Sequence, residues 1–305
     1  MYGAVRNGCG HGKQRWLCRA CGRTFVQPGL PRRRDRQRIW FERWIVEGYS
    51  VRQLVAQSGY SRSTIRRIIG YWLDRSPRRQ DDLGRFKYLV IDGTYLVKRQ
   101  IVVVGIADPV AKYLVAGSYG LKEGEARMRD YCYQLRSAGL LPVSITIDGL
   151  KQVQTMLKSV WPEARIQRCL VHIQRQGLAW CRRDPRTAAV KHLRRLFCHI
   201  TNVTSVTERD RFLEAWESWE RRFGGPIASR PGRGKVFSDV KRARSLLHYA
   251  LPSLFHYLEN PLIPSSTNWI EGYFSRLKAR YRQHRGLSPE HRESYFAWYF
   301  RLCRK

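Results

Sequence analysis

The order of short apolar runs after residue 85 places the tightest limit on what this chain can fold into. Three β-rich runs separated by turns come first and predict an antiparallel meander: RFKYLVIDGTYL, QIVVVGIAD and KYLVAGSYG. A helix over about 122–137 follows, and then the strand PVSITIDG, the helix KQVQTMLKSVW and the strand ARIQRC. This alternation predicts an α/β core whose first part spans 85–179.

The predicted order is that of a ribonuclease H-like fold, although several other α/β folds share parts of it. Asp92 and Asp148 each end an apolar strand, in VIDG and TIDG, and a single Asp-Gly pair in that position is usually a turn signal. On the first and fourth strands of such a sheet, however, the two carboxylates would lie side by side, and their repulsion would require a cation. Hard oxygen ligands select Mg²⁺ or Mn²⁺.

A third acid is expected from a late helix across the same end of the sheet. Glu271 is the only acid between Asn260 and Pro289, in SSTNWIEGYFSRLKARYRQHRGLS. The alternative is that Glu271 only pairs with a basic side chain of its own helix.

The charge of the chain indicates that its partner is nucleic acid. It has 57 Lys and Arg against 24 Asp and Glu, a formal net charge of +33, and so large a surplus opposes compact folding unless a polyanion offsets it. The hydrophobic content of 43% is enough for a folded core. No apolar run of about 18 residues and no signal-peptide core is present, so we expect no membrane contact and a cytoplasmic, nucleoid-associated protein.

Residues 31–75 have helical periodicity and predict a helix-turn-helix DNA-binding domain. Gly48 ends a first helix, Ser50 and Gln53 form a capping box, Gly59 makes a turn, and Ser61 starts a third helix. The predicted reading face of that helix is basic or hydroxylic and consists of Arg62, Ser63, Thr64, Arg66 and Arg67. An ordinary helical hairpin is the alternative. The polar stretch 76–84 is the predicted linker.

Together, four strings resemble the DDE transposases of the bacterial insertion-sequence branch related to Mutator elements: IDGTYL, TIDG, RCLVHIQRQ and TNWIEGYFSRLK. The resemblance covers about 85–300. In that group a Cys-x-x-His or Asp-x-x-His pair follows the second Asp by about twenty residues, as Cys169 and His172 do here. The catalytic Glu lies in an Asn-x-x-Glu context, and Asn268 supplies the Asn.

The resemblance implies metal-dependent cleavage and joining of DNA strands, with Asp92, Asp148 and Glu271 as the triad and two Mg²⁺ or Mn²⁺ ions. It also implies a helical insertion, placed over 180–262, before a last part of the core at 263–305. Within the insertion, GGPIASRPGRGKVF is predicted to be a basic loop. The expected partners are terminal inverted repeats, target DNA and a second copy in a dimer. Cys169 and His172 are either soft ligands or a packed Cys with a hydrogen-bonded His.

The N-terminal segment, 1–30, reads as a partial zinc ribbon. Its potential ligands are Cys9, His11, Cys18 and Cys21, and the last two form a CxxC turn. A truncated ribbon or a free-thiol loop is the alternative. The string QRWLCRACGRTF resembles the second half of the ribbon at the front of many such transposases, whose first CxxC would precede Met1.

Two other functions remain open at this point. One is a catalytically inactive DNA-binding protein or repressor on the same scaffold, which the three intact acids disfavour. The other is a Tyr or Ser recombinase, which uses a protein nucleophile within an Arg and His cluster. The group that comes near that pattern is Arg280, Tyr281, Arg282, His284 and Arg285.

Overall fold

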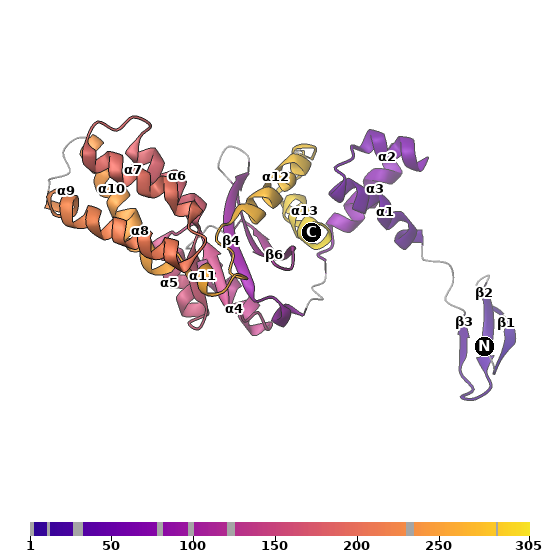
Figure 1. The fold of residues 1–305 in the computed structure, drawn as a ribbon. Helices are drawn as coiled ribbons and strands as arrows, with labels where there is room; N and C mark the ends of the chain where they lie inside the picture. Colours follow the sequence, from indigo (N-terminus) through magenta and orange to yellow (C-terminus); the bar gives the residue numbers. More distant parts are fainter. Residues whose placement is uncertain are drawn as a thin grey trace.

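The computed structural model describes residues 3–10, 13–26, 33–77, 82–96, 101–120, 126–229, 235–284 and 286–305. Figure 1 shows a small N-terminal sheet, a group of short helices, a central sheet with helices on its faces, and a second helical group at the other end. Within these ranges, no helix is long and apolar enough to cross a membrane.

The N-terminal sheet is an antiparallel meander. Its strands, in the order β1-β2-β3, are Ala4–Gly10, Lys13–Cys18 and Thr24–Val26. Cys18 ends β2, and the turn after it closes with a hydrogen bond from the Gly22 amide to the Cys18 carbonyl (2.9 Å). The predicted CxxC turn is therefore present between β2 and β3.

Three helices follow: α1 (Arg33–Val46), α2 (Val51–Ser58) and α3 (Arg62–Leu73). The signals that the sequence carries for them are confirmed. Ser50 and Gln53 form the capping box of α2, Gly59 ends α2 in the left-handed region, and the Ser61 side chain caps α3.

The central sheet has the order β6-β5-β4-β7-β8. Its strands are β4 (Tyr88–Leu96), β5 (Ile101–Asp108), β6 (Tyr113–Tyr119), β7 (Ser144–Ile147) and β8 (Arg165–Arg168). The first three form the predicted antiparallel meander, and β4, β7 and β8 are parallel neighbours. One expectation was wrong: Asp92 lies inside β4, because the strand continues past it to Leu96 by pairing with β5.

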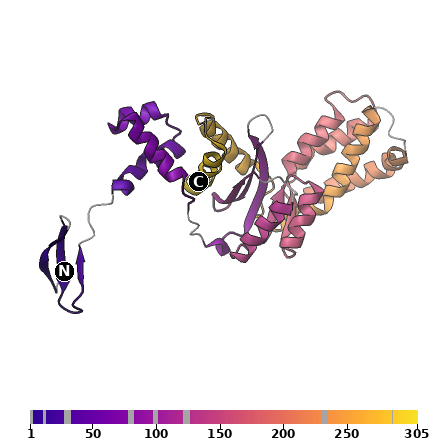
Figure 2. The same ribbon diagram turned by 180° about the vertical axis from the view of Figure 1, so that it is seen from behind.

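Helices cover both faces of this sheet, as Figures 1 and 2 show from opposite sides. On one face lie α4 (Ala126–Ser137) and α5 (Lys151–Val160), which bury an apolar cluster against β4, β5 and β7. On the other face lie α12 (Asn268–Arg282) and α13 (Pro289–Leu302). Gly117 of β6 lets α13 approach, since a Cβ there would lie 2.7 Å from the Phe300 ring.

A separate helical group lies between β8 and α12. Its elements are α6 (Leu170–Cys181), α7 (Ala188–His199), α8 (Val206–Trp219), α9 (Gly225–Ser229), α10 (Lys235–Ala250) and α11 (His256–Glu259). Short 3-10 helices at Ile200–Asn202 and Leu251–Ser253 and a π-helix at Glu220–Gly224 join some of them. The group has its own apolar core. The predicted boundary at 180 falls at the end of α6, whose apolar side packs into this core.

The predicted basic loop over 224–237 was wrong where the structure describes it. Residues 225–229 are helical, and α10 already begins at Lys235. Gly and Pro composition favours a loop locally, but tertiary contacts override it. Arg244 of α10 donates to the Glu220 carboxylate (2.9 Å from Nε to Oε1), which ties the turn before α9 to α10.

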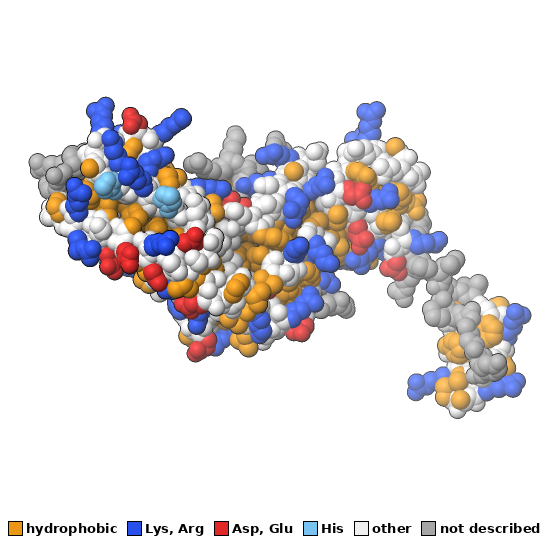
Figure 3. Space-filling model, viewed as in Figure 1, with side chains coloured by type: hydrophobic (Ala, Val, Ile, Leu, Met, Phe, Trp, Pro, Cys, Tyr) orange, Lys and Arg blue, Asp and Glu red, His pale blue; other side chains and the backbone are white. Residues whose placement is uncertain are grey.

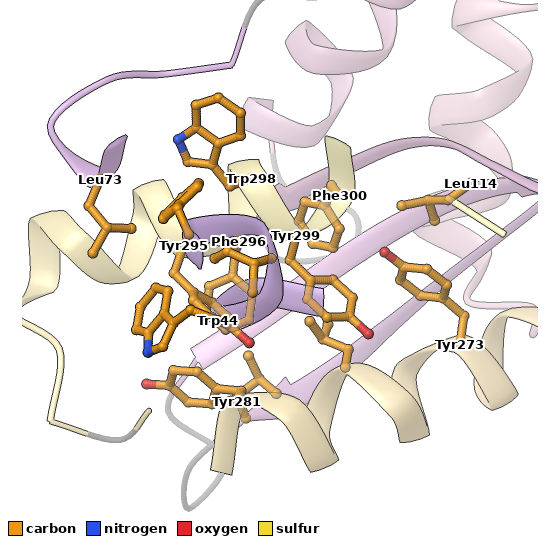
Figure 4. Close-up of a cluster of buried hydrophobic side chains, with 14 of the residues drawn as sticks. Trp44, Leu73, Leu114, Tyr273, Tyr281, Tyr295, Phe296, Trp298, Tyr299 and Phe300 are labelled. Atoms are coloured by element: carbon orange, nitrogen blue, oxygen red, sulfur yellow. The ribbon is translucent and has the colours of Figure 1, made fainter. Parts of the chain in front are cut away.

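The N-terminal helices pack directly on the C-terminal ones. Trp44 and Leu73 share one buried cluster with the aromatic side chains of α12 and α13 (Figure 4). The Trp298 indole nitrogen donates to the carbonyls of Trp72 (2.9 Å) and Arg75 (2.7 Å). In the predicted linker, residues 78–81 lie outside the described ranges, and Leu83 is buried against the sheet, in the short turn Leu83–Arg85. α1–α3 and the sheet domain are therefore joined by packing as well as by the chain.

Candidate active site

The register of β4 and β7 brings the first two predicted acids together. These strands are parallel, with Leu89 beside Ile145 and Val90 beside Thr146. β7 ends at Ile147, and Asp148 follows it directly. Extending the register by two residues sets Asp92 opposite Asp148, and the effect of Asp148 on the pKa of Asp92 agrees with this proximity. Because side chains alternate between the faces of a strand, Asp92 shares the face of Val90, which packs on the α12 side.

The packing of α12 on β5 brings the third acid to the same face. Glu271 lies in the first turn of α12. Gly105 is the register partner of Asp92 on β5, and a Cβ there would lie 2.8 Å from Ile270 Cδ1 and 3.0 Å from Phe274 Cζ. The missing side chain therefore lets α12 lie close to the sheet beside Asp92.

Electrostatics show that the other two acids affect Asp92. The pKa of Asp92 is raised to about 7, first because burial penalises the charged carboxylate and next because Asp148 is close. Glu271 raises it further, while the Gly93 amide (2.8 Å to Oδ1) and His172 lower it. Asp92 is thus held in a half-buried site where a second negative charge already lies.

Positive side chains of α6 lie beside Glu271. His172 Nε2 is 3.7 Å from Oε1, and Arg175 Nη1 donates to Oε2 at 3.4 Å. Oε1 is buried and has no hydrogen-bond partner. A buried carboxylate oxygen without a donor is costly, and a cation would satisfy it.

Cys169 and His172 join the beginnings of α6 and α12. The Cys169 sulfur accepts hydrogen bonds from the Thr267 amide (3.4 Å) and hydroxyl (3.5 Å), and His172 Nδ1 lies 3.2 Å from it. Burial opposes a thiolate, but the hydrogen bonds from His172 and Thr267 lower the pKa of Cys169. The hydrogen bond to Cys169 raises the pKa of His172 to about 9. The pair therefore holds a positively charged imidazole beside Glu271.

Arg168, Arg175 and Thr267 also belong to this site, although the sequence reasoning missed them. Arg168 is 6% exposed, and its Nη2 is 3.4 Å from the Asp148 carbonyl. An arginine at the end of an apolar strand, directly before Cys169, is the signal that could have found it. Asn268 opens α12 and its side chain is exposed, so it lies at the rim of the site.

The donor set fits a hard divalent cation. It consists of three carboxylates, one with a raised pKa and one with an unpartnered buried oxygen. In the part of the chain that is described, no three acid, His or Cys side chains stand close enough together to hold a metal ion as they are placed. Cys169 and His172 lie within hydrogen-bonding distance of each other, with 3.2 Å between the sulfur and Nδ1.

At the N-terminus the predicted zinc ligands are not brought together. Cys9 pairs with Gln14, whereas Cys18 pairs with Ala4, so the two cysteines lie at opposite ends of the β1-β2 hairpin. His11 is outside the described residues. Hydrogen bonds from the backbone of Cys21 and Ala20 lower the pKa of Cys18. The CxxC turn thus has the environment of half a zinc site, but Cys9 does not complete it.

The predicted reading face of α3 is on the surface. Arg62, Ser63, Arg66 and Arg67 are exposed, and Thr64 is half-buried with its hydroxyl 3.0 Å from that of Ser61. On the opposite side Ile65, Ile68 and Ile69 are buried. Figure 3 shows Lys and Arg side chains distributed along the whole visible face of the protein.

The basic cluster that raised the recombinase alternative lies where α12 packs against α1. Tyr281 is 3% exposed and packs among Tyr295 and Phe296. His284 Nε2 lies 3.0 Å from the Trp44 carbonyl, and burial lowers the pKa of His284 to about 4. Arg280 donates to the Glu47 carbonyl (2.8 Å). These side chains attach α12 to α1, so Tyr281 is not placed to act as a nucleophile.

Comparison with known proteins identifies the family. Residues 50–292 match the family described as "Transposase, Mutator family". The chain is 23% identical over 206 residues to the transposase for insertion sequence element IS905 of Lactococcus lactis, covering 64% of this chain and 48% of that relative. It is 23% identical over 240 residues to the transposase for IS6120 of Mycolicibacterium smegmatis, covering 75% of this chain and 69% of the relative.

This chain belongs to the Mutator family of transposases. The resemblance drawn from the four sequence strings is thereby confirmed at the level of the family. The chain spans about half the length of the Lactococcus relative that it matches.

Proposed function

We propose that this chain cuts and joins DNA strands at the ends of an insertion sequence, with Asp92, Asp148 and Glu271 as its acid triad. The observation that carries this proposal is the arrangement of three carboxylates, from β4, the end of β7 and α12, on one face of the sheet. The strand order, with β5 alone antiparallel to the rest, supports a ribonuclease H-like core. Membership of the family supports the same reaction.

The three acids would hold two Mg²⁺ or Mn²⁺ ions. When bound, such ions activate a water or a terminal 3′-OH and stabilise the leaving 3′ oxygen. The protein's own side chains do the rest. His172 and Arg175 hold Glu271 in place, and Arg175, 61% exposed, is positioned to contact a phosphate of the strand.

DNA binding would be shared between α3 and the basic surface. The exposed arginines of α3 are placed to enter a groove of the end sequence, while the remaining positive charge holds the backbone. The partners we propose are terminal inverted repeats and target DNA. A dimer would bring two ends together.

The test is incubation of the purified protein with labelled element-end DNA and Mg²⁺. We expect a nicked strand and then a strand-transfer product, and neither product in EDTA or with Asp148→Asn. End-specific binding without any cleavage product, in Mg²⁺ or Mn²⁺, would instead identify a DNA-binding protein or repressor.

A further inference from the structure

Next to Asp148 lies a groove that has no assigned role in the proposed cleavage reaction. It has a volume of about 690 Å³ and lies between the sheet domain and the helical group. Its sheet side is formed by the start of α5 and the end of β8, and its helical side by α6 and α10. The side chains that matter for its chemistry are Lys151, Arg168, Trp180, Arg242 and Tyr249.

Arg168 lies at the floor of this groove, where its guanidinium could bind an anion. Its guanidinium occupies the space beside Gly149 that a side chain would fill, since a Cβ there would be 1.9 Å from the guanidinium carbon. Arg168 is 6% exposed, and its Nε has no hydrogen-bond partner. A guanidinium that lines an open groove and has few protein partners suits a phosphate oxygen.

The N-terminus of α5 adds positive electrostatic potential at the end of the groove where Arg168 lies. Leu150 occupies the N-cap of α5 and provides no side-chain hydrogen bond, and no acid lies in the first turn. The backbone amides at a helix N-terminus attract phosphate. Lys151, exposed, adds a charge at the same point. Across the groove, Arg242 is also exposed, with Asp239 3.6 Å away.

The helical side of the groove offers aromatic surface. Tyr249 is 74% exposed, the highest value among the exposed large hydrophobic side chains of the described chain. Its ring makes a T-shaped contact with His248, with ring centroids 5.2 Å apart. Trp180 is half-buried in the same groove. Exposed aromatic rings beside basic side chains are the surface on which unpaired bases stack.

We propose that this groove holds an unpaired nucleotide of the DNA strand that passes Asp148, with its phosphate at Arg168 and the start of α5 and its base on Tyr249. The proposal rests on the proposed function, because it takes the strand to be bound at the acid site. A base inside a duplex is stacked on both sides and offers no face to Tyr249. The groove therefore selects a strand that is frayed or open beside the cleavage point.

The test measures binding by the full chain in EDTA, where no cleavage occurs. The probe is a duplex that carries a single-stranded oligothymidylate tail, and the reference is the same duplex with blunt ends. Tyr249→Ala should weaken binding of the tailed probe about tenfold, since a stacked base contributes substantially. Its binding of the blunt duplex should not change. Tyr249→Phe keeps the ring and should bind like the unchanged protein.

The matched control is Tyr133→Ala, which removes another exposed tyrosine, on α4 outside the groove. It should leave both affinities unchanged. A second measurement uses 5-iododeoxyuridine in the tail and maps the photo-cross-link, which we expect at Tyr249 or Trp180.

An equal loss on both probes, no loss with Tyr249→Ala, or cross-links only within α1–α3 would each overturn the proposal. Because the assay needs no metal and measures binding alone, its result can be interpreted whether or not the acid triad cleaves DNA. Conversely, a protein that cleaves DNA but binds both probes alike with Tyr249→Ala would keep the proposed function and lose this one.

Discussion

The surface of α3 and the acid site, formed by Asp92, Asp148 and Glu271, differ in how their charged side chains are placed. On α3 the charged groups are exposed arginines of one helix, and each reaches solvent independently. At the acid site the carboxylates come from β4, the end of β7 and α12, they are half-buried, and burial together with the neighbouring acids raises the pKa of Asp92. On α3, neighbouring positions on one helix set the spacing of the charges, whereas at the acid site packing between distant segments sets it.

This difference predicts how each region responds to change. Losing one arginine of α3 removes one contact and leaves its neighbours in place. Losing one acid, or shifting the helix that carries it, alters the whole site, because the groups act as a unit. The following experiments are arranged from the largest expected effect to the smallest.

Glu271→Gln should reduce Mg²⁺-dependent cleavage about a thousandfold or more, because it removes a negative charge from the metal ligands while preserving shape. Folding and DNA binding should persist, as circular dichroism and gel-shift assays would show. Glu259→Gln is the control, since Glu259 pairs with Arg165 (2.5 Å) on an exposed surface and should be dispensable. Normal cleavage by Glu271→Gln would remove Glu271 from the triad.

Gly105→Ala should lower cleavage by up to about a hundredfold, because the new Cβ meets Ile270 and Phe274 and shifts α12 with its Glu271. Single-turnover cleavage at saturating DNA measures this. Gly70→Ala in α3 is the control. A Cβ at Gly70 meets nothing within 4 Å, so the change should keep cleavage and raise the free energy of unfolding by up to about 1 kcal/mol. Equal rates for the two variants would mean that α12 does not depend on Gly105.

Arg66→Ala should weaken binding of the end sequence by about 1–3 kcal/mol and reduce the preference over unrelated DNA, if Arg66 reads a base edge. Fluorescence anisotropy over a salt series measures both. Arg52→Ala, at an exposed position on α2, serves as the comparison and should weaken binding of all sequences alike. The same uniform loss for Arg66→Ala would assign Arg66 to a phosphate.

Asp92→Asn should stabilise the metal-free protein at pH 8 by up to about 4 kcal/mol and have little effect at pH 4. The pKa of Asp92 is about 7 in the folded protein, above its ordinary value of 3.8. Above pH 7 the folded protein therefore carries the full cost of the buried charge. As the pH falls from 7 towards 4, protonation relieves that cost. Urea unfolding at both pH values measures the change in the free energy of unfolding. An equal increase at pH 8 and pH 4 would assign the effect to packing.

Local signals predicted much of the molecule correctly. The caps at Ser50, Gly59 and Ser61, the antiparallel meander, and the pairing of the Asp92 and Asp148 strands all depend on residues close in sequence or on a simple strand order. The errors arose where contacts with distant segments determine the local secondary structure. Asp92 is inside a strand because β5 continues to pair with it, and residues 225–229 are helical although their composition favours a loop.

By itself the sequence predicted most of the elements, the family and three candidate acids, because periodicity, capping and short motifs act over a few residues. Only the tertiary structure decided that α1–α3 pack on α12 and α13, that Gly105 admits Glu271, and that Arg168 lies against Gly149 beside Asp148. These contacts join segments far apart in the chain. Their geometry follows from how buried surfaces fit together, which no local pattern specifies.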